Sequence, residues 1–225
     1  AYMNLYNRMP AKEVVILGSG DIGMIMARRL TLEGAHVKAV FEIQPYPSGL
    51  PRNIEQCLND YGIPLFLSHT VTEIHGNARL SGVTVSEVDE RMKPIPGTEK
   101  EYACDTLILS VGLIPENELS LDAGVTLDQR TKGALVDEYF QTDVEGIFAA
   151  GNVLDVHDLV DFVSMEAEDL AESAAEYVRT GRLPECPLAV RPDGNINHTV
   201  PQRVSGTRAF KLSMRVNRPM KDCRV

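Results

Sequence analysis

Short apolar runs alternate with helical patterns along the first half of the chain. Four runs are almost wholly apolar, which is typical of parallel strands buried on both faces: 13–17, 36–41, 63–67 and 105–111. Residues 22–32 and 52–61 instead repeat apolar positions at helical spacing. Gly34 and Gly62 follow these two segments as helix ends. The alternation predicts an α/β fold with a doubly wound parallel sheet.

The pattern changes between the third and fourth apolar runs. Residues 71–74, residues 80–88 and a stretch around Tyr102 alternate apolar and polar positions between turn signals. Such alternation is typical of half-buried antiparallel strands. We therefore expect a small antiparallel meander inserted into the α/β unit.

The second half of the chain, after Pro115, has weaker patterns. Residues 134–137 and 147–150 resemble short strands, and alternation over 210–216 predicts another. A helix is predicted over 164–179, with Gly181 just past its end. Its predicted apolar stripe consists of Ala167, Leu170, Ala171, Ala174 and Val178. These changes of pattern divide the chain into three regions: 1–114, 115–182 and 183–225.

Composition narrows the possible functions. The chain has 225 residues, of which 44% are hydrophobic, and a formal net charge of −10. An acidic chain repels phosphate backbones, so we expect no nucleic-acid partner. No apolar stretch reaches the roughly 18 residues of a membrane span, and the first residues do not resemble a signal peptide. Four scattered cysteines without a CxxC pair indicate reduced thiols in a cytoplasmic protein: Cys57, Cys104, Cys186 and Cys223.

A glycine-rich turn between the first apolar run and the first helix carries the clearest chemistry. In the motif Gly18-Ser19-Gly20-Asp21-Ile22-Gly23, the first glycine permits a tight turn, the second lets a pyrophosphate approach the backbone, and the third lets helix and strand pack closely. The helix N-terminus then offers free N–H groups to the phosphates. A glycine-rich turn without a ligand is the alternative reading.

An acid follows at the expected place. Glu42 ends the second apolar run, nineteen positions after Gly23. A carboxylate there can accept hydrogen bonds from ribose hydroxyls and repels a 2′-phosphate, so NADH is favoured over NADPH. A surface acid without a ligand remains an alternative for Glu42, and a helix-dipole role remains one for Asp21. A methyltransferase is an alternative class of protein at this point, because it uses a similar glycine turn and acid.

Three segments together resemble the pyridine nucleotide–disulfide oxidoreductase superfamily of flavoproteins that bind two dinucleotides. They are 14–23, 104–117 and 146–153, in the family's order and spacing. The resemblance implies that region 1–114 is a Rossmann-like NAD-binding domain, with Gly112 in the turn that leaves it. It also implies that 115–182 is the C-terminal part of an FAD-binding domain and that 183–225 is a β-containing extension. The N-terminal half of the FAD domain is then missing, so we expect a fragment; the alternative is a natural remnant without flavin.

The resemblance also implies a flavin contact at Gly151 and Asn152. The family usually has Gly-Asp at this point, and the aspartate binds a flavin ribityl hydroxyl. Asn152 can still accept through its carbonyl oxygen, but the charge is lost. Asp155, His157, Asp158 and Asp161 follow, and we interpret them as helix-start capping and flavin-proximal groups rather than a metal site.

The implied activity is hydride transfer between the nicotinamide of NADH and the flavin of FAD, with no catalytic side chain identified. The alternative is a non-catalytic nucleotide-binding or assembly module. A narrower resemblance, in the phrases GSGDIG, SVGLIPENELS and GNVLDVHDLVDFV, is to a branch found beside FAD-dependent glycerol-3-phosphate or 2-hydroxyacid dehydrogenases. It implies a partner dehydrogenase subunit, and we also expect an oligomer.

Overall fold

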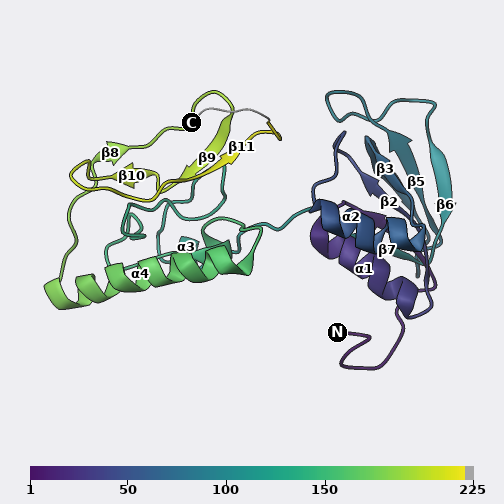
Figure 1. The fold of residues 1–225 in the computed structure, drawn as a ribbon, viewed down its shortest axis with the longest axis horizontal. Helices are drawn as coiled ribbons and strands as arrows, with labels where there is room; N and C mark the ends of the chain where they lie inside the picture. The colour runs from purple at the N-terminus through teal and green to yellow at the C-terminus, as the bar shows by residue number, and fades with distance from the viewer. Residues whose placement is uncertain (221–225) are drawn as a thin grey trace. The chain divides into compact units, whose positions relative to one another are not determined.

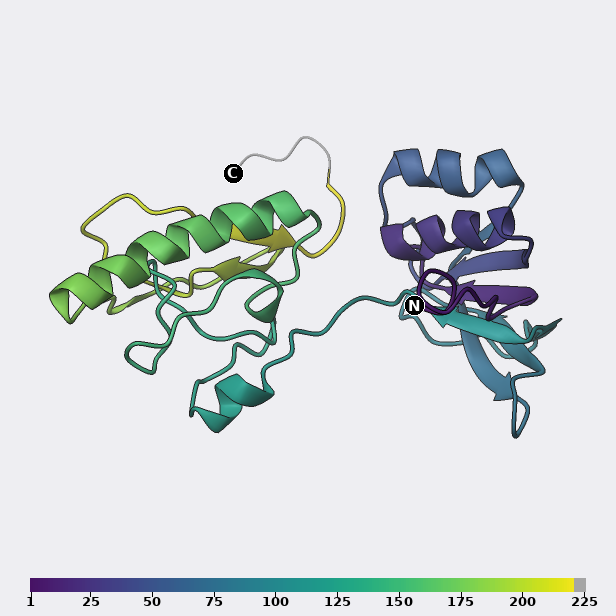
Figure 2. The ribbon, with the colours of Figure 1, turned by 90° about the horizontal axis from the view of Figure 1, so that it is seen from below.

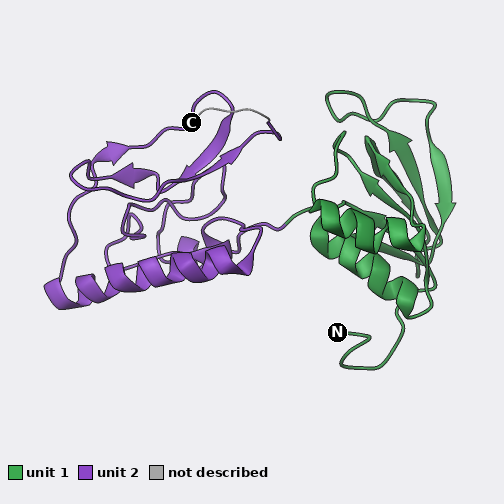
Figure 3. Cartoon of the chain, viewed as in Figure 1, with its two compact units in different colours: residues 1–112 green, residues 113–225 purple. Residues whose placement is uncertain are grey.

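The chain divides into two compact units, residues 1–112 and residues 113–225 (Figure 3). The structure is a computed structural model that describes residues 1–220. Each unit buries its own hydrophobic clusters. The assignment of 1–114, 115–182 and 183–225 to separate functional regions stays a prediction.

Unit 1 is built on a four-stranded parallel sheet of order β3-β2-β1-β7. Its strands are β1 (Glu13–Leu17), β2 (His36–Glu42), β3 (Leu65–Leu67) and β7 (Thr106–Leu109). Each lies within one of the four apolar runs or overlaps nearly all of it. The predicted α/β class with a parallel sheet is therefore confirmed.

The two faces of this sheet are covered differently (Figure 1, Figure 2). One face carries α1 (Asp21–Leu32), α2 (Pro51–Cys57) and a short 3₁₀ turn, η1 (Asn59–Tyr61). Against the other face packs the expected antiparallel meander, made of β4 (His69–His75), β5 (Gly82–Glu87) and β6 (Lys100–Ala103).

Alternation along the strands explains why both faces are apolar. In β1, Val14 and Ile16 point into the cluster shared with the helices, whereas Val15 points into the cluster shared with the meander. Phe41 on β2 adds aromatic packing on the meander side, with its ring centroid 5.4 Å from that of Phe66. The sheet thus contributes to an apolar cluster on each face, and the glycine turn follows the C-terminal end of β1.

Unit 2 combines one long helix with short strands. Its helices are α3 (Glu118–Asp122), η2 (Gly151–Val153) and α4 (Val160–Thr180). The strands form two antiparallel pairs, β8 (Leu188–Ala189) with β10 (Arg203–Val204), and β9 (Ile196–Val200) with β11 (Ser213–Val216). No helix in the described residues is long and apolar enough to cross a membrane.

Several predictions for this half were wrong. Residues 134–137 and 147–150 form only isolated bridges. In the first segment, Gln202 Oε1 accepts the N–H of Val136 at 2.9 Å, and in the second the N–H groups of Ile147 and Ala149 donate to nearby loop carbonyls. The strand predicted at 210–216 is confined to β11, and β9 was not predicted.

The apolar stripe predicted for α4 is also wrong. Val178, for example, is 84% exposed, and the one residue that α4 buries is Glu166. The stripe contains mainly alanine, which buries little area and so fixes the orientation of a helix only weakly.

Candidate functional site

The glycine turn of unit 1 packs tightly against the chain that follows β7. A Cβ added to Gly18 would lie 2.1 Å from the backbone oxygen of Ser110, and one added to Gly23 would lie 2.6 Å from the Ser110 Cβ. Gly18 also has a φ of +97°, which disfavours any other residue. The N–H of Gly23 donates to the Ser110 hydroxyl at 3.1 Å. Sequence reasoning missed Ser110, because only the fold brings it to a turn 87 positions away.

The N-terminus of α1 offers unused hydrogen-bond donors. Gly20 is the N-cap residue in an extended conformation, and no side chain caps the helix. In the part of the chain that the structure describes, the N–H groups of Gly20, Asp21 and Ile22 have no acceptor. Three free N–H groups at the positive end of a twelve-residue helix form a site suited to an anion.

Glu42 lies beside this turn and is 4% exposed. Its Oε2 accepts the N–H of Ser19 at 2.9 Å, the Ser19 hydroxyl at 2.6 Å and the Ser48 hydroxyl at 3.2 Å. Its Oε1 accepts the N–H of Gln44 at 2.9 Å. The predicted acid is therefore close to the glycine turn, and it is a buried acceptor rather than a solvated surface group.

The loop after β2 is fastened over the turn. The N–H of Ser48 donates to the Ser19 hydroxyl at 2.9 Å. Asp21 Oδ1 accepts the N–H of Leu50 at 2.8 Å and the side-chain amide of Asn53 at 2.6 Å. The Asp21 carboxylate thus holds this loop and the start of α2, which leaves its backbone N–H as the group that faces an anion. A direct cofactor contact by Asp21 stays a prediction.

Gly112 and Asn117 lie between the two predicted nucleotide turns in sequence. Gly112 is the last residue of unit 1, and its φ is +99° with no atom near the position of a Cβ. Asn117 is 5% exposed, and its side-chain amide donates to the carbonyl oxygens of Lys132 at 3.1 Å and Val153 at 2.9 Å. Asn117 therefore anchors the loops of unit 2 beside η2.

The second predicted turn, at Gly151 and Asn152, opens η2 in unit 2. Gly151 has a φ of +71° and donates its N–H to the carboxylate of Glu166 on α4. The carbonyl oxygen of Asn152 accepts the N–H of His157 at 3.1 Å, and the residue is exposed. Glu166 was missed from the sequence, because the pattern of α4 predicted that apolar residues face the core.

The acidic residues after this turn do not cap α4, contrary to expectation. α4 begins at Val160 with Leu159 as N-cap and has no side-chain cap. Instead Asp155 lies 3.2 Å from His198, and Asp158 lies 3.2 Å from Arg215. His198 on β9 and Arg215 on β11 contact these carboxylates because the strands fold back onto the segment. No group of three or more potential metal ligands comes together within residues 1–220.

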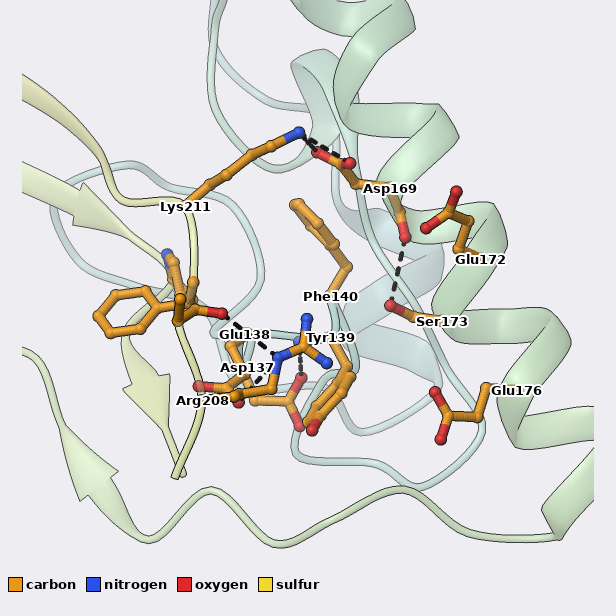
Figure 4. Close-up of a pocket in the computed structure, with 13 residues that line it drawn as sticks. Asp137, Glu138, Tyr139, Phe140, Asp169, Glu172, Ser173, Glu176, Arg208 and Lys211 are labelled. Atoms are coloured by element: carbon orange, nitrogen blue, oxygen red, sulfur yellow. Dashed lines mark hydrogen bonds and ion pairs between the residues drawn. The ribbon is translucent and has the colours of Figure 1, made fainter. Parts of the chain in front are cut away.

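A separate cavity of about 390 Å³ lies in unit 2, between α4 and the segments that precede and follow it (Figure 4). Its two cations are already engaged. Arg208 lies over the ring of Tyr139 at 4.8 Å, and Lys211 pairs with Asp169 at 2.7 Å. None of the predicted site residues lines this cavity. It is therefore distinct from both candidate nucleotide turns.

The fold and the glycine turn are typical of the class of dinucleotide-binding proteins, and comparison with known proteins identifies the family. The model of the pyridine nucleotide-disulphide oxidoreductase family matches residues 3–177. The chain belongs to this family, whose members are FAD-dependent oxidoreductases of pyridine nucleotides. The predicted family is confirmed.

The alignments with individual relatives cover much of this chain but only part of each relative. The chain is 28% identical over 160 residues to the NAD(P)H coenzyme A polysulfide/persulfide reductase of Pyrococcus horikoshii, covering 71% of the chain and 33% of that protein. It is 28% identical to the ferredoxin–NADP reductase of Ignicoccus hospitalis, covering 75% and 52%. The crystal structure of T. acidophilum thioredoxin reductase superposes with a TM-score of 0.64 at 27% identity, covering 77% and 55%. The chain thus spans from a third to about half of these relatives.

Proposed function

We propose that this chain is the NADH-binding part of an FAD-dependent oxidoreductase in which hydride passes between nicotinamide and flavin and then to an acceptor. One observation carries the proposal. The glycine turn presents three free N–H groups beside a buried carboxylate that already binds hydroxyl groups. A dinucleotide offers the matching chemistry, a pyrophosphate next to a ribose diol.

The pyrophosphate would be held by the backbone. The N–H groups of Gly20, Asp21 and Ile22 would donate to its oxygens, and the positive end of α1 would stabilise its charge. Gly20 has no side chain to keep the phosphates away from the backbone. The contacts that fasten the turn to Ser110 would hold these donors in place before the nucleotide arrives.

The adenosine ribose would be read by Glu42. Its Oε2 accepts the Ser48 hydroxyl at 3.2 Å, the longest of its four hydrogen bonds, so a ribose hydroxyl could take that place with the same donor chemistry. A 2′-phosphate offers negative charge instead, and the carboxylate would repel it. The proposal therefore includes a preference for NADH over NADPH.

Unit 2 would contribute part of the flavin site in the full-length protein. Gly151 supplies a left-handed turn, and Asn152 offers an exposed amide beside it. When bound, FAD supplies the hydride chemistry, and the chain's residues bind and orient the cofactors. We assign no nucleophile and no acid–base residue.

The proposal is tested by calorimetric titration of the chain with NADH and NADPH. We expect NADH to bind at least about tenfold more tightly, a difference of about 1.4 kcal/mol. Gly20→Val is expected to abolish NADH binding, because its side chain would cover the turn. The φ of −62° at Gly20 tolerates a side chain, but its Cβ would lie 3.2 Å from the Ser110 hydroxyl oxygen, so urea denaturation checks that the variant folds. Gly97→Ala is the control: its φ of +89° makes the substitution locally strained, but the space around it is open and it should bind NADH as wild type does.

Two outcomes would count against parts of this proposal. Equal affinity for NADH and NADPH would refute the role of Glu42, and no affinity for either would refute the nucleotide site. A full-length protein that binds NADH but is purified without flavin absorbance and takes up no added FAD would instead support the non-catalytic module.

A further inference from the structure

The long helix α4 buries one residue, and that residue is an acid. Glu166 is 8% exposed, although the helix has 21 residues. A buried carboxylate is costly unless hydrogen bonds satisfy it. Glu166 Oε2 accepts the N–H of Gly151 and lies 3.0 Å from Nε2 of His157. The acid therefore fastens the turn at Gly151 to the first half of α4.

His157 contacts both Glu166 and Asn152 and so links the helix to the turn. Its side chain is 12% exposed against Glu166, while its backbone N–H donates to the side chain of Asn152 at 3.1 Å. A backbone N–H can only donate, so the atom of Asn152 that faces it is the carbonyl oxygen. The amide NH₂ of Asn152 is left for another partner, and the residue is exposed.

We propose that Glu166 and His157 are positioning residues that orient Asn152 as a hydrogen-bond donor to a flavin ribityl oxygen. The inference rests on the proposed function, in which the full-length protein binds FAD at this turn. It reverses the expectation that Asn152 accepts from a ribityl hydroxyl. The atom that Asn152 contacts would be an acceptor, and the cofactor hydroxyl would direct its own hydrogen elsewhere.

The carboxylate of Glu166 favours a neutral amide over a second carboxylate at position 152. Glu166 already brings one carboxylate to the N–H of Gly151. An aspartate at position 152 would place a second carboxylate on the adjacent residue, where like charges repel. A neutral amide avoids this repulsion, and it supplies the donor that an ionised aspartate lacks.

Asn152→Asp in the full-length protein tests the orientation, and urea denaturation of the same variant shows whether repulsion from Glu166 disturbs the turn. If Asn152 donates, the aspartate removes the donor, and the dissociation constant for FAD should rise about tenfold, the effect of one hydrogen bond. FAD affinity is measured by fluorescence titration of the apoprotein. An aspartate variant that binds FAD as tightly as wild type, or more tightly, would overturn the proposal, because that result requires an acceptor.

Substitution of Glu166 tests the positioning role. Glu166→Ala removes both contacts and should weaken FAD binding about tenfold or more, whereas Glu166→Gln keeps an acceptor for Gly151 and should recover part of the affinity. Glu168→Gln, at an exposed position on the same helix, is the matched control and should bind FAD as wild type does. The NMR signal of the Gly151 amide proton should move in both Glu166 variants and stay in place in the control.

The affinity for NADH, measured on the same samples, separates the possible outcomes. Because the predicted NADH site lies in unit 1, all these variants should keep wild-type affinity for NADH. Unchanged FAD binding in Glu166→Ala would overturn the positioning role and leave the proposed function intact. A wild-type full-length protein that binds no FAD would refute the flavin part of the proposed function, and this inference with it.

Discussion

Both units place a glycine turn against a buried glutamate, but the two turns are held in different ways. In unit 1 the N–H of Ser19 donates to Glu42, and in unit 2 the N–H of Gly151 donates to Glu166. The first turn is also wedged against backbone at Ser110, whereas a Cβ on Gly151 would meet only a side-chain atom of Val163, at 3.1 Å. Backbone packing thus adds to polar side-chain contacts at the first turn, whereas the second turn depends mainly on polar side chains.

The partners of the two glutamates differ as well. Glu42 is surrounded by N–H and O–H donors that do not titrate near neutral pH: those of Ser19, Gln44 and Ser48. Glu166 shares one oxygen between a backbone N–H and an imidazole. A buried acid can therefore hold a glycine-containing turn from either a strand end or a helix face.

The largest effect that we expect comes from Gly18→Ala. The new Cβ would lie 2.1 Å from the Ser110 backbone oxygen, at a residue whose φ is +97°. We expect the free energy of unfolding of unit 1 to fall by more than about 3 kcal/mol, measured by urea denaturation. Gly34→Ala is the matched control, since Gly34 has the same φ and nothing within 4 Å, and it should cost only about 1–2 kcal/mol. Equal losses in the two variants would show that backbone packing does not fix the first turn.

A smaller effect is expected from Glu42→Gln. Both carboxylate oxygens face donors, so the amide NH₂ would meet an N–H or O–H group whichever way the side chain turns. The free energy of unfolding should fall by about 2 kcal/mol, because buried donors lose an acceptor. Glu73→Gln, at an exposed position on β4, should leave it unchanged in the same denaturation experiment. If Glu42→Gln were as stable as wild type, the description of Glu42 as a saturated acceptor would be wrong.

The smallest effect concerns Cys186 in unit 2. Burial, followed by the charges of Asp137 and Glu138, raises the pKa of this thiol from 9.0 to about 11. Because the pKa is higher in the folded than in the unfolded chain, the contribution of this thiol to stability is complete below pH 9 and is lost as pH rises towards 11. Iodoacetamide should therefore alkylate Cys186 slowly at pH 8 and faster as pH approaches 11, as followed by mass spectrometry. Labelling at pH 8 as fast as in the urea-unfolded chain would contradict the raised pKa.

The two units also differ in how far their structure could be predicted from the sequence. The parallel strands and the turn at 18–23 were found because burial on both faces and the need for glycine leave a local mark on the sequence. In unit 2 the isolated bridges at 134–137 and 147–150 were mistaken for strands; at 134–137 the side chain of the distant Gln202 completes a backbone hydrogen bond, which no local pattern reveals. Cys223, one of the four cysteines predicted to be reduced thiols, lies outside the described residues.

The sequence alone determined the family, the parallel sheet, the position of the glycine turn and the acid that accompanies it. The turn and its acid depend on the order of residues within one strand–helix–strand unit, where a fixed spacing brings two strand ends together, whereas the sheet and the family depend on short local motifs repeated along the chain. Only the tertiary structure decided that Ser110 supports the turn, that Asp21 holds a loop and that Glu166 binds Gly151. Each of these contacts joins residues far apart in the chain, and local patterns of hydrophobicity contain no information about which distant polar group will satisfy a given backbone N–H.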